Sequence, residues 1–199
     1  MVNFKEDEQL KMLNHSCAHL MAQAIKHLYP QAKFWVGPVV AEGFYYDVDL
    51  GDDVIRDEDI AAIEKEMKKV AKSGKKIIRH EITKEEALEM FKDDEYKLDL
   101  INGLEDGNIS CYTQGDFTDL CRGPHVDNVK LCRHFKLLRH SGAYWKGDSK
   151  NKVLQRESTA YVSRQLKNWK RICNFLRKPR KETIVRSARI WNFSWWMIW

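Results

Sequence analysis

Residues 10–28 read LKMLNHSCAHLMAQAIKHL, and this stretch predicts the element around which the fold is built. Its apolar side chains recur at spacings of three and four, from Leu10 and Leu13 through to Leu28, which is the period of one face of an α-helix. Pro30 follows almost directly and ends the helix, because its ring lacks an N–H and clashes with the preceding turn. We therefore expect a long helix with one buried face near the start of the chain.

Short strands are expected on the C-terminal side of this helix. Apolar and polar residues alternate in GFYYDVDL (43–50), and residues 34–40 predict a neighbouring strand that is interrupted at Gly37-Pro38. Further strands are predicted at 76–82, 109–112, 135–138 and 153–156.

Two more helices are expected between these strands. Residues 57–73 show helical periodicity and stop at Gly74, a residue that commonly ends helices. Thr83 and Glu86 form a capping box for a short helix that runs to Phe91. Helices first and strands later indicate one α+β domain, with a mixed or antiparallel sheet packed by helices around a cleft.

The composition is that of an ordinary soluble protein, with 43% hydrophobic and 32% charged residues. Residues 1–8 carry acids rather than an apolar run, so we expect no signal peptide. No stretch approaches the ~18 apolar residues that a membrane span needs. The five cysteines form no CxxC pair, which is typical of reduced thiols in the cytoplasm.

The net charge of +5 is distributed unevenly along the chain. Residues 165–199 hold nine Lys/Arg, one acid and five of the seven tryptophans, whereas residues 1–164 are net −3. The high isoelectric point therefore belongs to the tail and does not by itself indicate nucleic-acid binding by the body. We expect the domain at 9–164, a linker or remnant at 1–8, and a poorly packed tail at 165–199.

His15 and His19 form the first candidate site. Histidines four residues apart lie on the same helix face, so both imidazoles can reach one metal ion or one reacting group. An HxxxH pattern also arises in helices where both side chains are purely structural. The pair alone leaves both interpretations open.

The stretch DLCRGPHV (119–126) holds the second candidate site. Gly123-Pro124 excludes a regular helix, so Cys121 and His125 must converge across a tight turn. Together with the two helix histidines they supply four side chains of the types that bind zinc. The alternative is a turn with a buried cysteine and a histidine bonded to backbone.

The order and spacing of four stretches resemble the editing domain of bacterial threonyl-tRNA synthetases. They are HSCAHL (15–20), GFYYDVDL (43–50), DLCRGPHV (119–126) and GAYWKGDSKNKVLQR (142–156). The corresponding segment of alanyl-tRNA synthetases shares the HxxxH and CxxxH patterns. The resemblance covers about residues 12–156 and implies an enzyme that hydrolyses the ester joining serine to threonine tRNA, called post-transfer editing.

The resemblance also implies the site residues. It implies a catalytic pocket that is formed by His15, His19, Lys97, Asp119, Cys121 and His125. It places Tyr46 at the same cleft as a substrate-binding residue. Without the resemblance, Lys97 would be interpreted as an exposed lysine in the charged run 92–97, and Tyr46 as an aromatic residue of the core.

The same resemblance shapes the expectations on cofactors and partners. Hydrolysis is expected to need no cofactor, and we favour a metal-free pocket because four protein ligands would close a zinc shell and exclude the catalytic water. Zinc remains possible at His15, His19, Cys121 and His125. The expected partner is threonine tRNA mischarged with serine, held through phosphates by one of two basic groups. These are Lys68, Lys69, Lys72, Lys75, Lys76 and Arg79, or Lys130, Arg133, Lys136 and Arg139.

The chain departs from the family at both ends. Members normally carry a small ubiquitin-like domain before this one, and a class II core with ATP and zinc plus an anticodon-binding domain after it, through which the parent enzyme is expected to dimerise. We therefore expect no charging of tRNA by these 199 residues. Codons allowed for 178–194, read out of phase, can spell EAKERDHRKIGKDLEFF, which resembles the helix that leaves the editing domain. This predicts a truncated chain with a frameshift near Leu166.

Two other functions remain open at this stage. One is a zinc-binding module without activity that uses the same four side chains. The other is an inactive, truncated fragment. An ester-hydrolysis assay separates the first from an editing enzyme, and a cooperative unfolding transition separates the second.

Overall fold

A computed structural model describes residues 7–41, 43–105, 107 and 109–162 of the chain. The predictions for residues 1–6 and for the tail, including the frameshift, lie outside the described residues. The prediction for 9–164 is described only as far as 162.

The predicted first helix is present as α1 (Glu8–Leu28). Asp7 caps it, because its carboxylate accepts hydrogen bonds from the backbone N–H groups of Gln9 and Leu10, which have no partner inside the helix. The predicted apolar face is buried, and Leu13, Leu20 and other side chains on it are fully inaccessible. α1 is the central element of the fold because it contacts four other elements: α2 (Asp59–Ser73), β3 (Gly43–Asp49), β8 (Val153–Val162) and η1 (Val129–Cys132).

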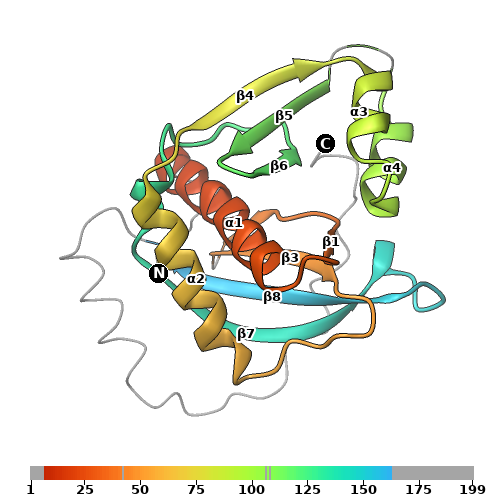
Figure 1. The fold of residues 1–199 in the computed structure, drawn as a ribbon. Coiled ribbons are helices and arrows are strands. Elements are labelled where there is room, and N and C mark those ends of the chain that lie inside the picture. The colour runs from red at the N-terminus through yellow and green to blue at the C-terminus, as the bar shows by residue number, and fades with distance from the viewer. Residues whose placement is uncertain (1–6, 42, 106, 108, 163–199) are drawn as a thin grey trace.

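α1 and α2 cover one face of a five-stranded antiparallel sheet, as Figure 1 shows. The strand order is β1-β3-β8-β7, and the short β2 also pairs with β3. These strands are β1 (Lys33–Phe34), β2 (Val39–Val40), β3 (Gly43–Asp49), β7 (Phe135–Tyr144) and β8 (Val153–Val162). The interruption predicted at Gly37-Pro38 separates β1 from β2.

A second, three-stranded antiparallel sheet lies beyond the other side of α1 (Figure 1). It contains β4 (Ile77–Ile82), β5 (Ile109–Gln114) and β6 (Phe117–Leu120) in that order. The helices α3 (Lys84–Met90) and α4 (Glu95–Asn102) pack against it through a small apolar core. The remaining element, η2 (Trp145–Gly147), follows β7.

The α+β class is confirmed, and α3 lies between β4 and β5, where a helix was predicted between two strands. The general description of helices first and strands later is wrong, because helices and strands alternate as far as β5. α4 and β6 were not predicted. α4 is short, and its first turn lies within the charged run 92–97. Asp94 caps it by accepting hydrogen bonds from the backbone N–H groups of Tyr96 and Lys97.

The capping box of α3 is confirmed, with Thr83 accepting from the Glu86 N–H and Glu86 accepting from the Thr83 N–H. β7 and β8 are much longer than predicted, because they pair with each other in a long antiparallel ladder whose register shifts near Leu137. Across the described ranges, no helix is both long and apolar enough to cross a membrane.

Candidate active site

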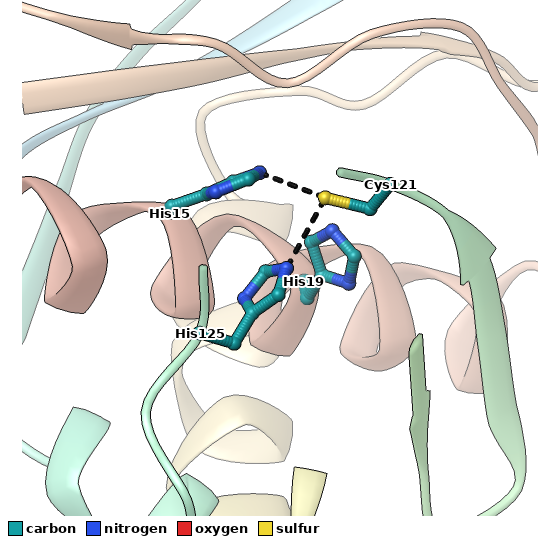
Figure 2. A group of neighbouring side chains, drawn as sticks. All are labelled: His15, His19, Cys121 and His125. Atoms are coloured by element: carbon teal, nitrogen blue, oxygen red, sulfur yellow. Dashed lines mark hydrogen bonds between the residues drawn. The ribbon is translucent and has the colours of Figure 1, made fainter. Parts of the chain in front are cut away.

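The four side chains with metal-ligand chemistry come together at one point between α1 and the end of β6 (Figure 2). His15 and His19 project from α1, Cys121 follows β6 directly, and His125 lies on the turn after it. The Cys121 Sγ lies 3.2 Å from the Nε2 of His15 and 3.2 Å from the Nε2 of His125. One ligand atom from each of the four lies within 4.8 Å of the others.

The turn that joins Cys121 to His125 depends on Gly123 and Tyr112. Gly123 has a φ of 75°, and a Cβ there would collide with the Tyr112 hydroxyl. The Tyr112 ring packs edge-on against His125, with centroids 4.4 Å apart, and the Gly123 N–H donates to the Cys121 Sγ at 3.2 Å. Tyr112 was not predicted as a site residue, because an aromatic residue in a strand carries no signal of such a role.

A second group of side chains forms a buried ion pair. The Lys97 Nζ lies 2.6 Å from the Asp119 Oδ1 and donates to the Trp35 carbonyl at 3.0 Å. The Tyr46 hydroxyl donates to the other Asp119 oxygen and also accepts from Lys97 at 3.4 Å. Lys97, Asp119 and Tyr46 are 2%, 1% and 2% exposed. The interpretation of Lys97 as a solvated lysine is therefore wrong.

His19 connects the two groups. Its Nε2 lies 3.8 Å from the Asp119 Oδ2, and only 3% of the residue is exposed. All seven residues that the resemblance implied thus lie in one contiguous cluster. The spacing of these residues along the chain does not predict that Asp119 meets His19, Tyr46 and Lys97, because these three partners come from α1, β3 and α4.

Burial decides the protonation states in the His–Cys group. Desolvation lowers the pKa of His15 to about 4, although the nearby Asp119 charge acts in the opposite direction. Burial also brings the pKa of His19 and of His125 far below its usual value. The pKa of Cys121 is raised to about 12 by burial. At neutral pH the group therefore offers uncharged imidazoles and a neutral thiol, so a cysteine thiolate is not its nucleophile.

The donor set fits zinc by type. Zinc accepts the four ligand atoms, which are three histidine nitrogens and one cysteine sulfur. The buried His19 Nδ1 also has no hydrogen-bond partner among the described residues. In a tetrahedral zinc site the ligand atoms lie about 3.4–3.8 Å apart, given Zn–N and Zn–S bonds of about 2.0–2.3 Å. The widest separation here, 4.8 Å, requires a small inward shift of the side chains.

A cavity of about 580 Å³ lies against the ion pair. Lys97 and Asp119 line it, together with the aromatic rings of Phe34, Phe91 and Phe117. None of the four His–Cys side chains lines it. The cavity therefore borders the cluster on the side of α4 and β6.

The two basic groups proposed for tRNA lie next to each other. Lys76 of the first group forms a β-bridge with Asn128, just before η1. The Glu64 carboxylate forms ion pairs with a lysine of each group, Lys68 at 3.7 Å and Lys136 at 2.6 Å. Lys72 and Lys130 are exposed. The side chain of Arg139 is not described.

Known proteins are similar in sequence to this chain. Residues 109–156 match the family described as the Threonyl and Alanyl tRNA synthetase second additional domain. Threonine--tRNA ligase of Acholeplasma laidlawii is 53% identical over 152 residues, which is 76% of this chain and 24% of that protein. The ligase of the same name from Desulfatibacillum aliphaticivorans is 45% identical over 194 residues, or 96% of this chain and 30% of its own length. One from Campylobacter jejuni is 46% identical over 189 residues, 94% of this chain and 31% of the relative.

The chain belongs to the threonyl-tRNA synthetase family. It spans about a quarter to a third of the length of these relatives. The family match at 109–156 contains Asp119, Cys121 and His125. The alignments that take in 94–96% of the chain also include α1 and α4, which carry the histidine pair and Lys97.

Proposed function

We propose that the cluster hydrolyses the ester between serine and the terminal ribose of threonine tRNA. The observation that carries this proposal is the contact between His19 and Asp119, because it joins a neutral imidazole–thiol group to a buried lysine–aspartate pair. Such a site holds a proton acceptor and fixed charges side by side. Membership of a family of aminoacyl-tRNA enzymes makes an aminoacyl ester the natural substrate.

Ester hydrolysis needs a water molecule, a group that takes its proton, and donors for the developing oxyanion. His15 is the proposed base, since it is the partly exposed member of α1's pair and stays unprotonated at neutral pH. The water oxygen adds to the carbonyl carbon while its proton passes to the His15 imidazole. The bond to the ribose oxygen then breaks, and that oxygen receives the proton. The Asp119 carboxylate stabilises the transient imidazolium.

Lys97 and Asp119 are proposed to bind and orient the substrate. The shortest contacts of Lys97 are to Asp119 and the Trp35 carbonyl, and its 3.4 Å contact to the Tyr46 hydroxyl is the weakest of the three. A substrate hydroxyl can replace that weak contact at low cost. Asp119 supplies negative charge for the ammonium group of the attached amino acid.

Such a site meets a physical need. Serine lacks one methyl group of threonine, and one methyl is worth only about 1–3 kcal/mol of discrimination in a binding pocket. A second site that admits serine and excludes threonine by size supplies the remaining accuracy. The expected partner is therefore threonine tRNA that carries serine.

We propose that the hydrolysis proceeds without a metal ion. Zinc would be held by His15, His19, Cys121 and His125, and when bound it would supply Lewis acidity there. Four protein ligands fill a tetrahedral shell, however, and leave no position for water. A zinc-binding module without activity is the second candidate function, favoured by the unpartnered His19 Nδ1.

Paired histidine variants test the proposal. His15→Ala and His19→Ala are expected to slow deacylation of seryl-tRNA by on the order of 100-fold or more, as removal of a general base or its neighbour does. His80→Ala is the matched control, because His80 is exposed on β4, outside the cluster, and should keep the full rate. Wild-type rates in both cluster variants would remove the proposal. A protein that binds zinc stoichiometrically and hydrolyses nothing would establish the second candidate.

A further inference from the structure

Ser16 is a buried residue of α1 whose hydroxyl touches three groups at once. It is 0% exposed and lies between His15 and Cys17 in the sequence. Its Oγ lies 2.8 Å from the Met12 carbonyl oxygen, 2.9 Å from the Val126 backbone nitrogen and 3.1 Å from the Nδ1 of His125. It therefore ties α1 to the turn that carries His125.

The hydrogens in this arrangement can be counted. A hydroxyl has one hydrogen to donate and two lone pairs to accept with. The Met12 carbonyl can only accept, so at 2.8 Å it takes the single hydroxyl hydrogen. The Val126 N–H can only donate, so it uses one lone pair. His125 must then donate its Nδ1–H to the second lone pair, since the hydroxyl has no second hydrogen for it.

We infer that Ser16 is a positioning residue that holds His125 in its Nδ1-protonated tautomer. A neutral imidazole carries one hydrogen, so the Nε2 of His125 then presents a lone pair to the Cys121 Sγ, 3.2 Å away. Replacing the serine by alanine removes the acceptor for the Nδ1–H. The imidazole is then free to move its hydrogen to Nε2, where it would occupy the centre of the pocket.

The same count explains what the pocket accepts. As the proposed base, His15 presents an unprotonated ring nitrogen to the pocket, and its Nε2 also lies 3.2 Å from the Cys121 Sγ. Two imidazole lone pairs thus face a single thiol hydrogen. One acceptor remains unmet, so the ligand that fits the centre is a hydrogen-bond donor or a cation. Water and an ammonium group belong to this class.

Nitrogen-15 NMR of the wild-type chain tests the inference directly. Protonated and unprotonated imidazole nitrogens have well-separated shifts, and correlations to the ring carbon-bound hydrogens show which nitrogen is which. In chelator-treated protein at pH 7 we expect His125 to be protonated at Nδ1. A hydrogen on Nε2 would overturn the inference, whatever any variant does.

Ser16→Ala, compared with Ser73→Ala, tests the consequence for catalysis. Ser73 also bonds a helix carbonyl, that of Val70 at 2.7 Å, but it belongs to α2 and contacts no histidine. We expect Ser16→Ala to shift the His125 hydrogen toward Nε2 and to lower kcat by about 10–100-fold with little change in KM, as loss of a residue that orients a site imidazole does. Ser73→Ala should change neither quantity.

The effect on kcat rests on the proposed function, whereas the tautomer does not. Wild-type protein without hydrolysis but with the expected His125 tautomer would refute the function and leave the inference standing. An unchanged tautomer in a folded Ser16→Ala variant would refute the inference.

Discussion

The buried pair of Lys97 and Asp119 gives the sharpest prediction about how the site is built. Lys97→Met keeps most of the side-chain volume and removes the ammonium group, which leaves the Asp119 carboxylate with the Tyr46 hydroxyl and the more distant, uncharged His19 imidazole. Breaking one partner of a buried ion pair costs about 3–5 kcal/mol, because the remaining charge stays desolvated. A small domain is stabilised by only about 5–15 kcal/mol, so the loss should be visible as a large drop in the urea midpoint.

The double variant Lys97→Met with Asp119→Leu should recover most of this loss. It removes both charges. The Tyr46 hydroxyl then loses its Asp119 acceptor and the Trp35 carbonyl loses the Lys97 donor, and an unsatisfied buried polar group of this kind costs about 1–3 kcal/mol. Lys92→Met is the matched control, since Lys92 pairs with Glu89 at 2.8 Å while 60% and 75% of the two side chains are exposed, and such pairs contribute about 0–1 kcal/mol. Urea unfolding followed by circular dichroism measures the unmodified chain and these three variants. A loss of stability in Lys97→Met no larger than that in Lys92→Met, or a double variant no more stable than Lys97→Met, would contradict this prediction.

Three further predictions concern pH, metal and tRNA. Burial raises the pKa of the Glu157 carboxyl from 4.5 to about 8, so the folded state binds this proton more tightly and the free energy of unfolding should fall as pH rises from about 4.5 to 8. Glu157→Gln should abolish up to about 5 kcal/mol of that fall, and the same pH dependence of urea unfolding in the variant and the unmodified chain would contradict this prediction. Zinc added to chelator-treated protein should bind once per chain at the His–Cys group and inhibit hydrolysis; activity that is lost on chelation and restored by zinc would reverse this. Lys72→Glu combined with Lys130→Glu should lower kcat/KM for aminoacyl-tRNA by about 10-fold at low salt, less at high salt, and leave hydrolysis of seryl-adenosine unchanged.

The sequence predicted those parts of the fold whose signal is local. Apolar residues recur along α1 at spacings of three and four without a break, and the capping box of α3 needs only two residues that are three positions apart. The convergence of Cys121 and His125 followed from Gly123-Pro124, because that dipeptide allows only a tight turn.

The parts that escaped prediction depend on contacts between distant segments. Lys97 belongs to a charged run, and it is buried only because α4 turns it toward Asp119. Asp119 lies on β6 of the three-stranded sheet, more than twenty residues further along the chain. Ser16 offers no pattern of its own, since its role appears only when Val126 and His125 are brought to α1. The resemblance to a known family named Lys97 and Tyr46, whereas periodicity and spacing did not.

The most direct test of the proposed function is a comparison of two substrates with the unmodified chain. Threonine tRNA is charged separately with serine and with threonine, and the loss of each ester is followed at pH 7 with the spontaneous rate subtracted. We expect the seryl ester to be hydrolysed more than about 10-fold faster than the threonyl ester, because the site excludes the extra methyl group. Equal rates on both substrates, or no rate above the spontaneous one, would contradict it.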